Sequence, residues 1–292
     1  MKTLILSIVI VGSALFISAF KAPQKPITEL KDLKKVLKDG YSFVPSGRIL
    51  LESDTVSVQG FFMMKGEVSN FDYKEFLMYL KSNNRMMEYY AALPDSTQWE
   101  KHQLTPFKNT YFSHPVYRTY PVVNITKNQA QAYCDFLTEV WQKNTNNKKI
   151  KFRLPLKAEF LRASYGEDLH RTYPWKGEYL RDGKGCYMSN FATVSSEDIS
   201  RNQKSGKLEV VKDKQPNYKE GAMFTASVIS YSPNEWGLYN LSGNVSEMIA
   251  DGPVALGGNW NSPGYDVRCE SAIPFNDANP YVGFRPVMTY VK

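Results

Sequence analysis

The segment of residues 236–247, with the sequence WGLYNLSGNVSE, constrains the fold of this chain more than any other feature. It contains two glycines and two asparagines, residue types that let the backbone turn sharply and direct its carbonyl groups inward. Asn240 and Glu247 add side-chain oxygens, and hard oxygen ligands of this kind suit calcium. We therefore expect a tight, turn-rich structure in this part of the chain.

The composition is that of a globular protein. Of the 292 residues, 42% are hydrophobic and 14% are aromatic, which supplies ample material for a core. The formal net charge is +7, and much of it lies in the basic stretches 21–38 and 144–151, which we interpret as solvated surface. No nucleic-acid-binding motif accompanies this charge, so we expect no nucleic-acid partner.

Residues 1–20 are expected to form a signal peptide. Lys2 precedes an apolar run that ends at Phe20, a pattern typical of export signals. The run is also close to the shortest membrane span, so an uncleaved N-terminal anchor is the alternative. The chain is therefore expected to be exported to the periplasm or cell envelope, and an anchor would associate it with the membrane. Residues 21–40 follow as a basic linker or short helix.

Three cysteines, Cys134, Cys186 and Cys269, are widely spaced along the chain. Export would place them in an oxidising compartment, and one is left over if two pair. The sequence does not determine the pairing. No CxxC motif or Cys/His metal spacing is present, so no zinc site is predicted.

Capping residues and apolar periodicity predict three helices. The first begins at Ser69 or Asn70, the second at Thr126, and the third after Pro155. The apolar stripes of the first two consist of Tyr73, Phe76, Leu77 and Leu80, and of Ala130, Tyr133, Phe136 and Leu137.

Short strands are predicted over residues 56–64, 121–126 and 152–154, with further short strands in the last third of the chain. Residues 83–120 resemble an insertion that wraps the core, and residues 143–149 and 195–218 are predicted loops. Neither an internal repeat nor a linker between two cores is evident. Residues 41–292 are therefore expected to form one α+β domain with much irregular structure.

Five segments, in this order along the chain, resemble the sulfatase-modifying-factor family, whose founding member is the formylglycine-generating enzyme. The segments are EVSN at residues 67–70, PVV at 121–123 with 130–137, RLP at 153–155 with 158–159, YPW at 173–175, and the block 234–285. The resemblance implies an irregular, loop-rich fold similar to a C-type lectin, in which bound calcium replaces part of a core.

Within that family the middle of the chain is most similar to the gliding-motility and type IX secretion lipoproteins. The likeness is carried by residues 93–99, 111–117, 120–123 and 185–191. It implies that the chain works in a complex of envelope proteins. The chain lacks the lipobox cysteine of those lipoproteins, which places lipid anchoring in doubt.

The resemblance also implies two structural calcium sites. One would use the side chains of Asn240 and Glu247 with the carbonyls of Gly243 and Val245. The other would use the Asn190 and Glu220 side chains with the carbonyls of Phe191 and Ala222. The alternative is a hydrogen-bonded loop without metal, because Asn side chains close turns and carboxylates accept backbone N–H groups.

Catalysis of the formylglycine type requires two cysteines after a Gly-Gly motif, where their thiolates bind copper(I). Aligned on Gly257-Gly258, these positions hold Ser262 and Val267, and Cys269 lies two residues beyond the second. Copper is therefore not expected. The iron-dependent branch of the family uses three histidines from a partner domain for which this chain has no room.

Three side chains near the C-terminus are interpreted mainly as structural. Arg285 is expected to form a buried ion pair or carbonyl clamp, and Arg268 a similar pair with Glu270 or Asp266. Trp260 is expected in the core, although it would also suit a pocket for a peptide or glycan.

The leading hypothesis from the sequence is a non-catalytic, exported scaffold or binding protein of the envelope. Exposed tyrosines of the 83–120 insertion would form its contact surface. The alternatives are an oxidase or other metalloenzyme of the same family, and a lectin-like module that binds glycan or peptide.

Overall fold

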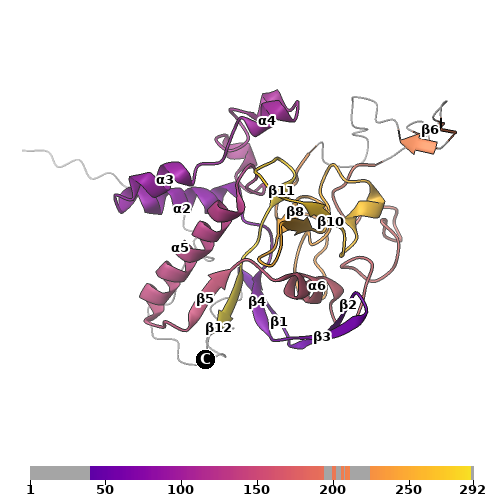
Figure 1. The fold of residues 1–292 in the computed structure, drawn as a ribbon, viewed down its shortest axis with the longest axis horizontal. Coiled ribbons are helices and arrows are strands. Elements are labelled where there is room, and N and C mark those ends of the chain that lie inside the picture. The colour runs from indigo at the N-terminus through magenta and orange to yellow at the C-terminus, as the bar shows by residue number, and fades with distance from the viewer. Residues whose placement is uncertain (1–39, 194–198, 202–204, 207, 211–223, 291–292) are drawn as a thin grey trace, which may run out of the picture.

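The computed structural model describes residues 40–193, 199–201, 205–206, 208–210 and 224–290. The predicted signal or anchor and the basic segment after it lie outside these residues. Two four-stranded sheets, two hairpins and several helices make up the fold (Figure 1). No helix in the described part of the chain is long and apolar enough to cross a membrane.

The first sheet has the strand order β1-β4-β12-β5 and is antiparallel throughout. Its strands are β1 (Tyr41–Val44), β4 (Phe61–Met64), β12 (Val287–Tyr290) and β5 (Ile150–Arg153). The two ends of the domain therefore meet in one sheet, since β12 lies between β4 and β5. The hairpin β2 (Gly47–Leu51) and β3 (Asp54–Val58) connects β1 to β4.

The second sheet has the order β10-β9-β8-β11, with β11 parallel to β8. Its strands are β8 (Ser246–Met248), β9 (Val254–Leu256), β10 (Ala272–Pro274) and β11 (Val282–Gly283). The 3-10 helix η4 (Gly264–Val267) lies between β9 and β10. The predicted loop at 195–218 contains a small hairpin, β6 (Ile199–Arg201) and β7 (Leu208–Val210), and most of its other residues lie outside the described chain.

Two layers of core cover the two faces of the first sheet. Phe62 and Met288 pack with helices α2 (Asn70–Ser82) and α5 (Lys127–Thr145), whereas Met63 and Val287 pack with α6 (Lys157–Tyr165). Successive side chains of a strand point to opposite faces, so neighbouring residues enter different cores. Because both faces are covered, all four residues of β4 are buried.

The three predicted helices are confirmed, and their caps are where the sequence places them. Ser69 caps α2 in a reciprocal capping box with Asp72, and Thr126 caps α5 in the same way with Gln129. The predicted loop at 143–149 is shorter than expected, because α5 continues to Thr145 and ends at Asn146 in a left-handed conformation.

The predicted strand over 121–126 is wrong. Only an isolated bridge joins Pro121 to Ser69, and Val122 donates its N–H to the Val68 carbonyl. The backbone then turns at Asn124, which has a φ of +60°. A left-handed residue interrupts the alternation that a strand needs, so pairing stops after one bridge.

The 83–120 insertion is part of the core. It forms α3 (Met86–Ala91), α4 (Gln98–Lys101), η1 (Thr105–Phe107) and η2 (Pro115–Tyr117), with α2, α3 and α5 gathered on one side of the molecule (Figure 1). Trp99 and Tyr111 are buried and pack with Val123 and Val245. Tyr111 is therefore not available to the predicted contact surface of exposed tyrosines, whereas Tyr90 is 65% exposed; the surface itself stays a prediction.

Candidate functional site

The glycine-rich segment 236–247 curls through left-handed backbone conformations. Asn240, Gly243 and Asn244 have φ values of +53°, +71° and +58°. A Cβ atom on Gly243 would lie 2.2 Å from the Ser189 hydroxyl and 2.3 Å from the Asn190 carbonyl oxygen, so only glycine fits. The turn brings this segment against Asn190, whose carbonyl accepts the Asn244 N–H at 2.8 Å.

Arg285 and Glu247 form an ion pair at the centre of the molecule. The guanidinium donates to both carboxylate oxygens, at 2.6 Å from Nε and 2.5 Å from Nη2, and the two side chains are 0% and 1% exposed. Arg285 also donates to the carbonyls of Lys65 at 3.0 Å and Tyr239 at 2.7 Å. The predicted buried ion pair and the predicted carbonyl clamp are both confirmed.

Glu67 adds a second buried carboxyl to this network. Its two oxygens accept from the amides of Asn240 at 3.1 Å and Asn244 at 2.8 Å. Burial raises the pKa of Glu67 to about 8; Arg285 opposes this shift, and Glu247 adds to it. Burial also raises the pKa of Glu247, and the charge and hydrogen bonds of Arg285 oppose that shift. Because Arg285 donates to both oxygens of Glu247, Glu67 is the carboxyl that more readily takes up a proton.

The first predicted calcium site lies in this network. Some of its ligand residues already make hydrogen bonds within the network, and others do not. Both oxygens of Glu247 accept from Arg285, and the Asn240 amide donates to Glu67. The carbonyls of Gly243 and Val245 accept no hydrogen bond from another described residue. The backbone oxygens fit a calcium ion, and Glu247 would have to share its carboxylate between the ion and Arg285.

The second predicted site contains an unsatisfied ligand atom. Asn190 is 1% exposed, and its Oδ1 atom has no hydrogen-bond partner among the described residues. Its Nδ2 atom is used, since it donates to the Phe224 carbonyl at 2.7 Å. The side chain of Phe191 is buried, whereas Glu220 and Ala222 lie outside the described residues. A buried amide oxygen without a partner fits a cation ligand, because leaving it unpaired is unfavourable.

The loop after Gly257-Gly258 is packed and contains no open cleft at the two positions assigned to cysteine. The Ser262 hydroxyl accepts the Asn259 N–H at 3.1 Å, and the Val267 side chain is 0% exposed. Trp260 is 8% exposed and donates its Nε1–H to the Pro280 carbonyl at 3.2 Å, which confirms its core position. Serine is thus a turn residue here and valine a core residue.

The remaining thiols and histidines do not assemble into a metal site. Cys269 and Cys134 are free and buried, and burial raises the pKa of both thiols; Cys186 is free and exposed. Across the described residues, no three His, Cys, Asp or Glu side chains are arranged to hold a metal ion. Arg268 stacks on Tyr265 and donates to its carbonyl, so its predicted pairing with Glu270 or Asp266 is wrong.

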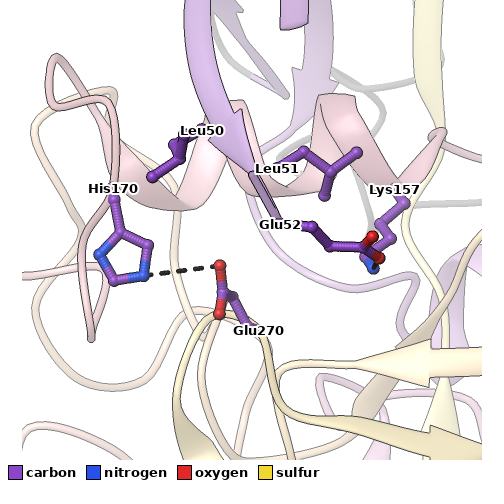
Figure 2. Close-up of a pocket in the computed structure, with 6 residues that line it drawn as sticks. All are labelled: Leu50, Leu51, Glu52, Lys157, His170 and Glu270. Carbon is purple, nitrogen blue, oxygen red and sulfur yellow. Dashed lines mark ion pairs between the residues drawn. The ribbon is translucent and has the colours of Figure 1, made fainter. Parts of the chain in front are cut away.

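A surface pocket of about 340 Å³ lies away from the buried network, and we name it the His170 pocket (Figure 2). It is lined by Leu50, Leu51, Glu52, Lys157, His170 and Glu270. His170 Nε2 lies 3.5 Å from Glu270 Oε1, and Lys157 Nζ lies 3.9 Å from Glu52 Oε1. The buried Tyr165 hydroxyl donates to Glu270 Oε1 at 2.5 Å. Burial and this hydrogen bond raise the pKa of Tyr165, so the hydroxyl stays protonated.

The sequence did not assign roles to Glu67, Asn244 or the His170 pocket. Glu67 stands beside the buried Val68, two residues before the cap of α2. A carboxylate in such an apolar setting is a signal of a buried polar network, but its hydrogen-bond partners, 173 and 177 positions away, could not be identified without the fold. The pocket residues come from four separated segments, so no local motif marks them.

The chain has relatives among characterised proteins. A family model described as the "Sulfatase-modifying factor enzyme 1-like domain" matches residues 29–290. The mouse formylglycine-generating enzyme is 28% identical over 217 residues, 67% of this chain and 50% of that protein. The Streptomyces coelicolor enzyme of the same name is 28% identical over 158 residues, 53% of this chain and 37% of that protein. The chain thus spans about half or less of the length of these relatives.

A solved structure, PvdO from Pseudomonas aeruginosa, has the same fold. It superimposes with a TM-score of 0.51 over 85% of this chain and 93% of that one, at 16% identity. At this identity the likeness concerns the fold alone. It confirms the predicted α+β, loop-rich architecture.

Proposed function

This chain belongs to the sulfatase-modifying factor enzyme 1-like family, and on that premise we propose that it is an exported, non-catalytic scaffold or binding protein of the cell envelope. The finer assignment to the gliding-motility and type IX secretion branch is supported by the segments 93–99, 111–117 and 185–191. The proposed partner is a complex of envelope proteins.

One observation carries the proposal that the chain is not an oxidase. At the two positions where the family resemblance expects copper-binding cysteines, Ser262 closes a turn with Asn259 and Val267 fills the core. Copper(I) is selected by soft thiolates, whereas a serine hydroxyl is a hard ligand and valine has none. The nearby Cys269 is buried, and its raised pKa disfavours the thiolate. The donor set therefore supports binding over oxygen activation.

Oxygen uptake tests this part of the proposal. The purified chain is incubated with copper(I), a cysteine-containing peptide and oxygen, beside an authentic formylglycine-generating enzyme. We expect uptake only from the authentic enzyme, and no aldehyde in the peptide treated with this chain. Copper-dependent uptake by this chain that a Cys269→Ser variant abolishes would overturn the proposal.

Assembly in the envelope tests the other part. A tagged chain is expressed in its own host, and detergent extracts of the envelope are separated by native electrophoresis. We expect the tag to migrate in a discrete large complex that is absent from the soluble fraction. Migration as a monomer in every fraction would contradict a scaffold role.

We also propose structural calcium in the two oxygen-rich loops. The unpartnered Oδ1 of Asn190 supports the second site, and the carbonyls of Gly243 and Val245 support the first. Glu220 and Ala222 would complete the second site. Calcium there would stiffen loops that have little regular structure, because a closed set of oxygen ligands fixes the residues that supply them.

A further inference from the structure

We propose that the His170 pocket binds a free aliphatic α-amino acid, with the ammonium group at Glu270 and the carboxylate at Lys157. This inference is independent of the proposed scaffold role. It rests on the position of two loose ion pairs, on an anchored carboxylate and on an apolar wall between them.

Four separate segments build the pocket around a fixed opening. Leu50 and Leu51 come from β2, Lys157 opens α6, His170 follows that helix, and Glu270 follows η4. The Leu50 N–H donates to the Leu169 carbonyl at 2.8 Å, which ties the β2–β3 hairpin to the loop that carries His170. This bond holds the apolar wall against the polar one.

The ionisable side chains of the pocket stand in two pairs, His170 with Glu270 and Lys157 with Glu52 (Figure 2). The His170–Glu270 separation is 3.5 Å and the Lys157–Glu52 separation is 3.9 Å. Hydrogen bonds between charged groups are usually about 2.7–2.9 Å long, so neither pair is closed. Each pair therefore leaves a charged atom for a ligand to contact.

Glu270 is held in place to receive a cation. The hydroxyl of Tyr165, a residue with 0% exposure, donates to Glu270 Oε1 at 2.5 Å and fixes the rotamer of the carboxylate. A carboxylate fixed in this way is preorganised for an ammonium group. On the other side, the Lys157 backbone N–H donates to Asp251 at 2.7 Å, which fixes the base of that side chain.

The mixed charges select a zwitterion. A simple anion would be repelled by the carboxylates of Glu52 and Glu270, and a simple cation would be repelled by the ammonium group of Lys157. A ligand with both charges satisfies the two sides together, and Leu50 and Leu51 offer an apolar surface for its side chain. The volume of about 340 Å³ lies at the small end of ligand pockets, which suits a molecule of the size of leucine.

Isothermal titration calorimetry with three isosteric probes tests the proposal. The purified chain is titrated with leucine, with leucinamide, which lacks the carboxylate, and with 4-methylpentanoate, which lacks the ammonium group. We expect leucine to bind with a Kd of about 1 mM or tighter, and both analogues to bind at least about tenfold more weakly. Absence of leucine binding, or equal binding of the three probes, would overturn it.

Variants then locate the site. Glu270→Gln keeps an acceptor for Tyr165 and removes the charge, and Lys157→Met keeps most of the apolar stem. Each is expected to weaken leucine binding about tenfold, whereas Lys143→Met on the exposed surface of α5 leaves it unchanged. If Glu270→Gln fails to fold, as judged by thermal melting, the test of the pocket rests on Lys157→Met alone. Unchanged binding in Lys157→Met would reject the pocket as the site.

Discussion

Arg285 donates to both carboxylate oxygens of Glu247 across a distance of 38 residues in sequence, and neither side chain reaches solvent. The pair joins the segment after β11 to β8, and Arg285 also donates to the carbonyls of Lys65, which follows β4, and Tyr239. Removing two charges from water is unfavourable unless their geometry is good and their other hydrogen bonds are made. Here both conditions are met.

Breaking this pair from one side should be strongly destabilising. An Arg285→Met variant leaves Glu247 buried without its partner, and we expect a loss of about 3–5 kcal/mol of unfolding free energy. The double variant Arg285→Met/Glu247→Leu removes the uncompensated charge and should recover part of that loss. Urea unfolding of the parent protein and the two variants checks both expectations, and a double variant less stable than Arg285→Met would contradict them.

The stability of the fold should fall between about pH 5 and pH 8 because of Glu67. Burial raises the pKa of Glu67 to about 8 from an ordinary value of 4.5. Between those values the folded state keeps a proton that the unfolded state has released, so a rise in pH favours unfolding. Between pH 5 and pH 8 the free energy of unfolding should fall by an amount on the order of 4 kcal/mol, because the pKa of Glu67 is so strongly raised.

A Glu67→Gln variant should remove most of this dependence, since glutamine imitates the protonated acid. We expect it to match the parent protein near pH 5 and to exceed its melting temperature near pH 8. Glu100→Gln serves as the control, because that side chain lies on the surface. If the melting temperature changes by the same amount between the two pH values in the parent protein and in Glu67→Gln, Glu67 does not titrate as expected.

The parts of the fold that could be predicted from sequence are those encoded locally. The Ser69–Asp72 and Thr126–Gln129 capping boxes each lie within four residues, and their helices begin where predicted. The Glu67 network could not be predicted, because Asn240 and Asn244 lie 173 and 177 residues away in the sequence and only the fold brings them to Glu67. The strand prediction over 121–126 was wrong although it rested on a local pattern. The Val-Val-Asn-Ile sequence suits a strand, but the left-handed conformation of Asn124 ends the pairing.

The cap of α5 offers a test of that local encoding. Thr126 Oγ1 accepts the Gln129 N–H at 3.3 Å, and Gln129 Oε1 accepts the Thr126 N–H at 2.7 Å. Thr126→Ala removes one half of this exchange, and we expect a loss of about 1 kcal/mol in urea unfolding. Thr126→Ser retains the hydroxyl and should lose much less. A larger loss in the serine variant than in the alanine variant would argue against capping as the cause.

Calcium should raise the melting temperature if Asn190 is a ligand. At a concentration about 100 times its Kd, a bound ion adds about 2.7 kcal/mol to the stability of the folded state. We therefore expect a lower melting temperature after chelation, and recovery when calcium is restored. In Asn190→Ala the calcium-dependent part of the shift should shrink, while in the exposed Asn144→Ala it should persist. A melt unaffected by chelator would contradict both proposed sites.

Trp99 should contribute strongly to the stability of the domain although it lies in a segment that resembles an insertion. Its side chain is 3% exposed and packs on Tyr111 with ring centroids 4.8 Å apart and on Phe107 at 5.3 Å. Removing the Trp99 side chain leaves a cavity beside Val123 and Val245, so Trp99→Ala should cost about 3–5 kcal/mol of unfolding free energy.

Tyr90→Ala is the control. It changes an exposed aromatic residue of the same segment and should cost less than about 0.5 kcal/mol. Equal urea midpoints for the two variants would mean that the insertion folds apart from the core, and deletion of residues 83–120 would then leave a folded domain.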